Sequence, residues 1–182
     1  MPGRKWRLRY FLLGFLALIL GYYAIDYYWR EKRWRWIIVH HTAADRGNME
    51  YYRELHQKER GWPDIAYHIL INNGSYNTMP GQIEVSQAWL ERSHHYSTKR
   101  TMFNYFGIAV ALVGNFSRYP IPGLQKEALV ELLARLATDH GVAVENIVGH
   151  GEVWTTECPG NRVDMQEIRS LVRERLAQGR SL

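Results

Sequence analysis

WIIVHHT, at residues 36–42, is the stretch that decides the fold of this chain. Its apolar, mostly β-branched run has the length of a buried strand, and two histidines follow where that strand should end. Successive side chains of a strand point to opposite faces, so His40 and His41 cannot both enter one site while the strand stays regular. The stretch therefore predicts a buried strand that can bring only one of its histidines into a given site.

A second stretch, HGEVWTTEC at residues 150–158, holds the only cysteine and is followed by a Pro-Gly pair. The apolar run at 146–149 is typical of a strand, and the polar segment closed by Pro-Gly is typical of a loop. A strand end and a returning loop can bring His150 and Cys158 together. With one histidine of the stretch at 36–42, they would supply two imidazoles and one thiolate. These are the ligands of a zinc ion that has one open position, as in catalytic sites. By spacing alone, a buried cysteine and a hydrogen-bonded histidine are the simpler interpretation.

Two further segments lie between these stretches, GWPDIAYHILI at 61–71 and NYFGIAVALVGNF at 104–116. In this order, the four pieces resemble the zinc-dependent N-acetylmuramoyl-L-alanine amidases. That family includes the bacteriophage-type amidase lysozymes and the peptidoglycan recognition proteins. The resemblance covers about residues 34 to 178 and rests on the order of the pieces, since no single piece is specific.

The resemblance implies that His40, His150 and Cys158 are ligands of Zn²⁺. It implies that Tyr67 is a catalytic hydroxyl beside the metal. Thr156 matches a position that is threonine in recognition-protein amidases and lysine in some phage enzymes. A zinc ion held in this way lowers the pKa of bound water toward about 7 and polarises an amide carbonyl. The Tyr67 and Thr156 hydroxyls could donate hydrogen bonds to the oxyanion that develops.

The sequence also departs from the family pattern in several places. Ala66 stands where the family often has glycine, and Gln82 where relatives often have arginine. Ala109 stands where some members carry a glutamate, which argues against a glutamate-based mechanism. The pair His94 and His95 looks like the family's substrate-side histidine, although an apparent insertion obscures which of the two aligns.

Other interpretations of these residues stay open. Tyr67 could be an ordinary strand aromatic, and Glu152 and Glu157 could be general bases or solvated loop carboxylates. A peptidoglycan-binding module without catalysis, anchored in the membrane, is the alternative function. A structural zinc protein is a third class, and it would need a fourth ligand. The candidates for that ligand are His68, His94, His95 and His140.

Charge is distributed unevenly along the 182 residues. Residues 1–35 carry eight Lys or Arg and two acids, whereas the remainder carries 15 basic and 16 acidic side chains. The net charge of +5 therefore belongs to the N-terminus, and the globular part is close to neutral. A basic nucleic-acid-binding surface is not indicated, so no nucleic acid is expected among the partners.

Residues 10–29 are long and apolar enough to span a membrane, and aromatic residues gather at their far end. A cleaved signal peptide is the competing interpretation, but no convincing small-x-small cleavage site is present. We expect a single-pass protein of the cytoplasmic membrane. Its peptidoglycan or muropeptide substrate lies outside that membrane, which places the catalytic domain on the outer side.

The remaining pattern predicts one α/β domain. Apolar residues recur with helical period over 125–140 and 164–177, a further helix is expected over 48–60, and Asn73-Gly74 is a strong hairpin signal between 67–71 and 76–79. We therefore expect a mixed central β-sheet flanked by helices and preceded by an N-terminal transmembrane helix. The expected parts are a basic cytoplasmic tail at 1–9, a transmembrane signal-anchor at 10–29, a charged linker at 30–35 and a zinc amidase domain at 36–178.

Overall fold

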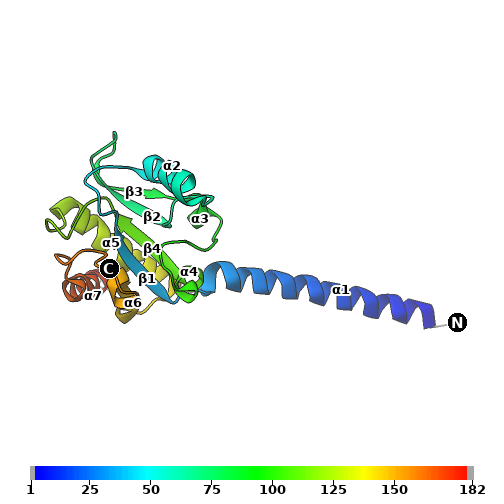
Figure 1. The fold of residues 1–182 in the computed structure, drawn as a ribbon. Helices are drawn as coiled ribbons and strands as arrows, with labels where there is room; N and C mark the ends of the chain where they lie inside the picture. The colour runs from blue at the N-terminus through cyan, green and yellow to red at the C-terminus, as the bar shows by residue number, and fades with distance from the viewer. Residues whose placement is uncertain (1–2, 180–182) are drawn as a thin grey trace. The chain divides into compact units, whose positions relative to one another are not determined.

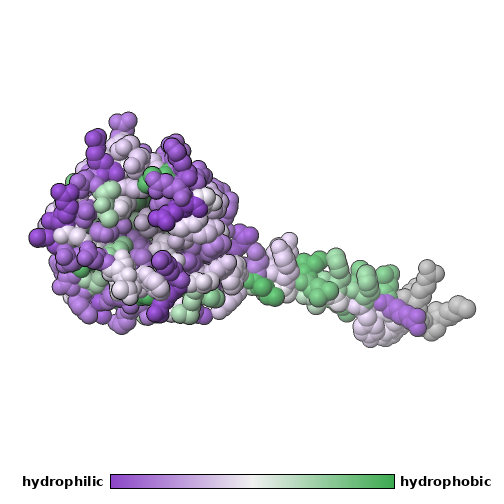
Figure 2. Space-filling view, viewed as in Figure 1, coloured by the Kyte–Doolittle hydropathy of each residue, from purple (hydrophilic) through white to green (hydrophobic). Residues whose placement is uncertain are grey.

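A computed structural model describes residues 3–179 and divides the chain into two compact units, 1–33 and 34–182. The first unit is a helix, α1 (Gly3–Tyr27), which continues as a π-helical turn, η1 (Tyr28–Lys32). Its apolar stretch, Trp6–Lys32, has 27 residues and a mean hydropathy of 1.8. At about 1.5 Å per residue it is longer than the hydrocarbon core of a bilayer, about 30 Å. Figure 2 shows that the surface of this helix is largely apolar and that the visible face of the second unit is mainly polar.

The helix extends further than the sequence pattern predicts. Helical structure runs through Lys32, so part of the segment 30–35, predicted to be a charged linker, is helical. Arg30 Nε lies 2.9 Å from an Asp26 carboxylate oxygen. This i,i+4 ion pair supports the C-terminal end of the helical segment.

The second unit is built on one five-stranded sheet (Figure 1). Its strands are β1 (Trp36–His41), β2 (Ile69–Asn73), β3 (Pro80–Val85), β4 (Gly107–Leu112) and β5 (Ile147–Gly149). The spatial order is β3-β2-β4-β1-β5, with β3 antiparallel to β2 and every other pair parallel. The mixed central sheet expected from the sequence is therefore confirmed.

Helices cover both faces of this sheet (Figure 1). They are α2 (Met49–Arg60), α3 (Gln87–Leu90), α4 (Thr101–Phe106), α5 (Gly123–His140), the 3₁₀ turn η2 (Val144–Asn146), α6 (His150–Val153) and α7 (Met165–Gly179). On one face α5 and α7 bury the main apolar core with Ile37 and Val39 of β1. On the other face α2 packs over β2 and β4. Because side chains alternate, His40 lies on the α2 side of the sheet.

Two strands begin later along the chain than the sequence pattern indicates. Residues 76–79 were expected to form the second hairpin strand, but β3 begins only at Pro80. Tyr76 and Asn77 have φ angles of 52° and 61°, a left-handed conformation that a strand excludes. Residues 104–106, the start of the apolar segment 104–116, form the end of α4, and β4 begins only at Gly107.

Gly107 marks the change from helix to strand. A Cβ at this position would lie 2.3 Å from Ile38 Cδ1 and 2.5 Å from the carbonyl oxygen of Phe103. Only glycine allows β4 to start so close to both β1 and α4. The expected helices over 48–60, 125–140 and 164–177 are confirmed within two residues at each end.

Parallel pairing decides where a site can form. β1 lies between β4 and β5, and its register pairs Val39 with Gly149. His40 is the next-to-last residue of β1, and His150 directly follows β5 at the same edge of the sheet. The carboxyl ends of neighbouring parallel strands are the usual position of a binding site in α/β folds.

Candidate metal centre

Three of the predicted site residues meet at this edge. One ligand atom each from His40, His150 and Cys158 lies within 4.8 Å of the other two. His40 Nδ1 is 3.5 Å from Cys158 Sγ, and the rings of His40 and His150 have centroids 4.6 Å apart. His40 comes from β1, His150 from the start of α6, and Cys158 from the loop after α6. The fold thus brings together residues that are up to 118 positions apart.

Backbone hydrogen bonds hold the cysteine loop in place. Gly151 N donates to the Cys158 carbonyl over 2.6 Å, and His41 N donates to Cys158 Sγ over 3.4 Å. Gly160 follows with a φ of 107°, and a Cβ there would lie 2.4 Å from the carbonyl carbon of Phe116. Pro-Gly closure of the loop, expected from the sequence, therefore has a steric cause.

Burial sets the protonation of the three residues. It lowers the pKa of His40 well below its usual value, and the neighbouring His150 lowers it further. Burial also lowers the pKa of His150. Both imidazoles are therefore neutral near pH 7, which is the form that binds a metal. Burial raises the pKa of Cys158 to about 11, partly opposed by the N–H of His41. A bound cation would favour its thiolate.

The donor set fits Zn²⁺. His150 Nε2 is buried and has no hydrogen-bond partner among the residues that the structure describes. An unpaired buried nitrogen costs about 1–3 kcal/mol, and a metal ion would satisfy it. Two imidazole nitrogens and one sulfur suit zinc, with one position left for water or substrate.

The two predicted hydroxyl residues line the same cavity, which has a volume of about 460 Å³. The Tyr67 ring centroid is 5.2 Å from that of His40. Burial raises the pKa of Tyr67 above its usual value, and the charge of Cys158 raises it further, so the hydroxyl keeps its proton. Thr156 Oγ1 accepts a hydrogen bond from Cys158 N over 3.2 Å. Its own proton is free to point elsewhere.

The ring of His41, the neighbour of the candidate ligand His40, is turned toward Phe116, as strand alternation predicts, while His41 also borders the cavity. His41 Nδ1 accepts a hydrogen bond from Phe116 N over 3.1 Å, on the side of the main core.

The carboxylate of Glu152, considered above as a general base, is engaged in hydrogen bonds. Its carboxylate accepts from Gly149 N over 2.6 Å and from Arg169 over 3.1 Å. Glu152 therefore braces the start of α6, whereas Glu157 lines the cavity.

The candidates for a fourth protein ligand lie elsewhere. Within residues 3–179, the metal-binding group consists of three side chains. His68 Nδ1 accepts from Ala109 N over 3.2 Å, away from the cavity. His94 stacks on Tyr105 with centroids 4.5 Å apart, and His140 lies against Trp34. The structural zinc interpretation therefore has no fourth histidine in the described group.

The sequence did not single out Ser97, which also lines the cavity. Its Oγ lies 2.9 Å from His40 Nε2, on the ring edge opposite Cys158. The residue sits in a polar and aromatic segment without periodicity. No sequence signal distinguishes it from the neighbouring serines.

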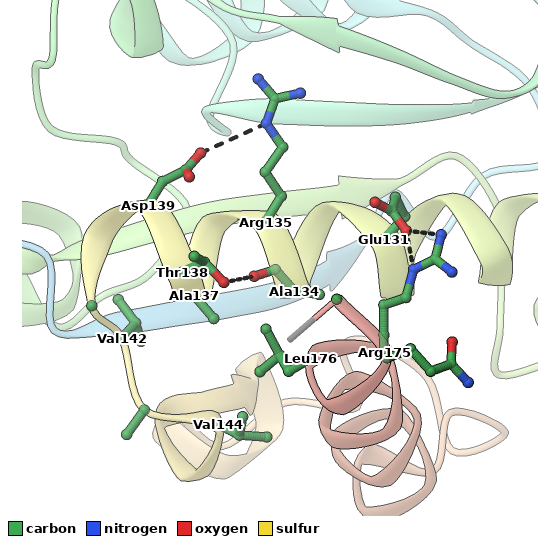
Figure 3. A pocket seen from close by; sticks show the side chains of 14 residues that line it. Glu131, Ala134, Arg135, Ala137, Thr138, Asp139, Val142, Val144, Arg175 and Leu176 are labelled. Atoms are coloured by element: carbon green, nitrogen blue, oxygen red, sulfur yellow. Dashed lines mark hydrogen bonds and ion pairs between the residues drawn. The ribbon is translucent and has the colours of Figure 1, made fainter. Parts of the chain in front are cut away.

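A larger cavity, about 980 Å³, shares no lining residue with the candidate metal centre (Figure 3). It is bounded by α5, η2 and α7, with apolar side chains such as Leu176 and Val144 and with ion pairs at its rim. Arg135 Nε lies 3.6 Å from Asp139, and Arg175 pairs with Glu131. Its lining contains no histidine, cysteine or tyrosine. Size alone therefore does not identify the functional site.

Comparison with known proteins agrees with this geometry. Residues 30–161 match the family model described as N-acetylmuramoyl-L-alanine amidase. Peptidoglycan-recognition protein SC2 of Drosophila melanogaster is 27% identical over 143 residues, covering 73% of this chain and 71% of the relative.

Solved structures share the fold. The amidase LysC from Clostridium intestinale URNW is 25% identical, with a TM-score of 0.67, over 78% of this chain and 87% of its own. A mutant of Drosophila PGRP-LB, solved in complex with tracheal cytotoxin, is 23% identical, with a TM-score of 0.59, over 77% and 83%. The family model matches residues 30–161, which is most of this chain, and the chain therefore belongs to the N-acetylmuramoyl-L-alanine amidase family.

Proposed function

We propose that this protein is a zinc-dependent hydrolase that cleaves the amide bond between N-acetylmuramic acid and L-alanine in peptidoglycan. One observation carries the proposal. A complete His40, His150 and Cys158 donor set shares a cavity with the Tyr67 hydroxyl. The tracheal cytotoxin bound in the PGRP-LB mutant structure, a monomeric diaminopimelic acid-type peptidoglycan, supports a ligand of this chemical class.

Zinc, when bound, would activate a water molecule and polarise the amide carbonyl. The chain's own residues then serve the reaction in distinct ways. His40 and His150 offer neutral nitrogens, and Cys158 offers a thiolate. The Tyr67 hydroxyl, which keeps its proton, donates a hydrogen bond to the oxygen on which negative charge develops. Thr156 contributes a second hydroxyl at the cavity wall.

Three positions were considered for an acidic catalytic residue, and one of them, Glu157, carries a carboxylate that borders the cavity. Ala109, the position that is glutamate in some relatives, is fully buried in β4 and carries no acid. Glu152 is committed to Arg169 and Gly149. Glu157 lines the cavity and is the acid available to carry a proton to the departing amine.

A peptidoglycan-binding module without catalysis is the second candidate. The observation that favours it is the likeness to recognition proteins such as SC2. A pure binding module has no use for an open metal position beside a protonated tyrosine. The full donor set therefore favours the hydrolase.

We further propose that α1 anchors the protein in the cytoplasmic membrane, with the amidase unit on the outer side. The apolar stretch Trp6–Lys32 is long enough to span a membrane, and none of its residues is buried. Carbonate extraction of membranes tests this directly. The full chain should stay in the pellet, and release into the supernatant without detergent would contradict the anchor.

The experiment for catalysis uses the full chain in detergent and purified sacculi. Release of free L-alanine amino termini, together with free lactyl groups on the glycan, reports cleavage of the proposed bond. Tyr67→Phe should bind zinc normally but lose about 10²-fold in turnover, the usual effect of removing one oxyanion donor. An inactive wild type that still binds muropeptides would favour the binding module. Full turnover in zinc-loaded Tyr67→Phe would make Tyr67 a packing residue.

A further inference from the structure

We propose that Ser97 and His95 are positioning residues that fix the tautomer of His40, holding its proton on Nε2 so that Nδ1 is presented to the metal. The inference rests on the proposed zinc site, since it assigns a purpose to groups behind one candidate ligand. It concerns only residues of the second unit. It also gives a role to His95, one of the two histidines that the sequence suggested for the substrate side.

The two ring nitrogens of His40 face different groups. Nδ1 lies 3.5 Å from Cys158 Sγ, within the candidate donor set. Nε2 lies 2.9 Å from Ser97 Oγ. If Nδ1 binds a metal, Nε2 must carry the proton and donate it to an acceptor. Ser97 Oγ is in the right place to accept.

A backbone group determines which way the hydrogen bonds run. Ser97 N lies 3.2 Å from His95 Nδ1, and a backbone N–H can only donate. His95 Nδ1 is therefore an acceptor, and the ring proton is on Nε2. That nitrogen lies 3.1 Å from the carbonyl oxygen of Phe103, which can only accept. Both ring nitrogens of His95 therefore have defined roles, since Nδ1 accepts a hydrogen bond and Nε2 carries the proton.

The hydroxyl of Ser97 links the two rings. Its Oγ is 2.8 Å from His95 Nδ1, an acceptor, so the hydroxyl proton points there. A lone pair of Oγ is then left for the Nε2 proton of His40. All protons in the chain from His40 through Ser97 and His95 to Phe103 point the same way. The backbone N–H and the hydroxyl of Ser97 share the lone pair of His95 Nδ1, and the shorter contact is that of the hydroxyl.

Burial protects this arrangement from water. His95 is 0% exposed and His40 is 1% exposed, so water does not readily replace their hydrogen bonds. The opposite tautomer of His40 would place a proton on Nδ1, where it would point at Cys158 and block metal binding. It would also draw the Ser97 proton away from His95. The network therefore selects the tautomer that can bind.

The segment that carries Ser97 is tied firmly to α4. Asn104 Nδ2 donates to the Thr98 carbonyl over 2.9 Å, and Thr98 N donates to Asn104 Oδ1 over 3.1 Å. His95 N donates to the Asn104 carbonyl over 3.2 Å. Because α4 leads directly into β4, the position of Ser97 is coupled to the sheet that carries His40.

The test has two readouts on the full chain in detergent. Selective ¹⁵N labelling of histidine reports the tautomer in metal-free protein, and His40→Gln identifies the His40 signals. Wild-type His40 should show a single form with the proton on Nε2, and Ser97→Ala should show a mixture. Competition with a chelator then measures zinc affinity. Ser97→Ala should bind zinc about 10- to 100-fold more weakly, the usual effect of losing such a partner.

Matched variants separate positioning from folding. Ser97→Thr keeps the hydroxyl and should restore both readouts. Ser93→Ala removes a hydroxyl from the same segment, one that donates to the Ala88 carbonyl over 3.3 Å, and should change neither. If Ser97→Ala fails to fold, the wild-type tautomer still decides, because a proton on Nδ1 of metal-free His40 would overturn the proposal. Unchanged zinc affinity in folded Ser97→Ala would overturn it as well.

Neither readout depends on amidase activity. A protein that shows the expected tautomer and zinc affinities but cleaves no peptidoglycan would reject the proposed function and keep this inference. A protein that cleaves peptidoglycan with His40 in the other tautomer would do the reverse.

Discussion

Replacing Arg169 by methionine should destabilise the amidase unit by about 2–3 kcal/mol. Arg169 lies on α7, and its side chain is only 8% exposed. Its Nη1 donates to the Ile147 carbonyl over 2.8 Å, and its guanidinium reaches both carboxylate oxygens of Glu152 at 3.1 and 3.2 Å. The arginine therefore joins the last strand of the sheet to the short helix that begins with His150.

The magnitude follows from what the substitution leaves behind. Breaking a buried ion pair by removing one partner costs about 3–5 kcal/mol. Glu152 is 43% exposed, so water can solvate its carboxylate once Arg169 is gone, and the loss is smaller. The Ile147 carbonyl, by contrast, is left without this donor in a buried position. Methionine keeps the packing of the arginine stem, so the figure refers to polar interactions alone.

Urea unfolding followed by near-UV circular dichroism measures the effect, with a lower midpoint at unchanged slope as the expected result. Glu152→Gln is the matched comparison, because the amide oxygen can still accept from Gly149 N. It should lose about 1 kcal/mol and keep its turnover on sacculi. A loss below about 0.5 kcal/mol in Arg169→Met would refute the reasoning. A stable but inactive Glu152→Gln would return Glu152 to the acids that act in catalysis.

Three further predictions concern the same unit. Cys158→Ser should lose most bound zinc, because a serine hydroxyl is not ionised near neutral pH; metal analysis after gel filtration checks this, and full zinc content would remove Cys158 from the ligand set. Burial raises the pKa of Asp64, but hydrogen bonds from two backbone N–H groups and from Arg53 outweigh it, so the pKa lies below its usual value. Asp64→Asn should therefore lose about 1–3 kcal/mol at pH 7, and the difference from wild type should shrink as pH falls through the lowered pKa of the folded protein; a difference independent of pH would contradict this. Gly160→Ala should unfold at lower temperature and retain less zinc, because its Cβ would lie 2.4 Å from the Phe116 carbonyl carbon at a φ of 107°; wild-type melting and zinc content would show that the loop adapts.

Much of the architecture is readable from local pattern. The apolar run at 36–39 and the helical periods over 125–140 and 164–177 predict their elements, because burial of one face imposes these periods on the sequence. The hairpin shows the limit of that approach. Its turn extends to Met79 because Tyr76 and Asn77 adopt left-handed backbone conformations, which no hydrophobic pattern reveals.

For the candidate site as well, the sequence predicts the residues, but the structure decides how they come together. His40, His150, Cys158, Tyr67 and Thr156 were identified from motif order, and the structure places all five around one cavity. Their convergence follows from the parallel pairing of β1 with β5, which ends both strands at one edge.

What the sequence by itself determined is the class of fold, the apolar N-terminal helix and the residue types of the donor set. Tertiary structure alone decided which groups support them. Ser97 meets His40 across 57 positions and Arg169 meets Glu152 across 17, and neither pairing leaves a periodic or compositional trace. The physical reason is that a hydrogen bond depends on the position of single atoms in space. Hydrophobic burial, in contrast, is shared by many residues and therefore leaves a pattern that can be read along the chain.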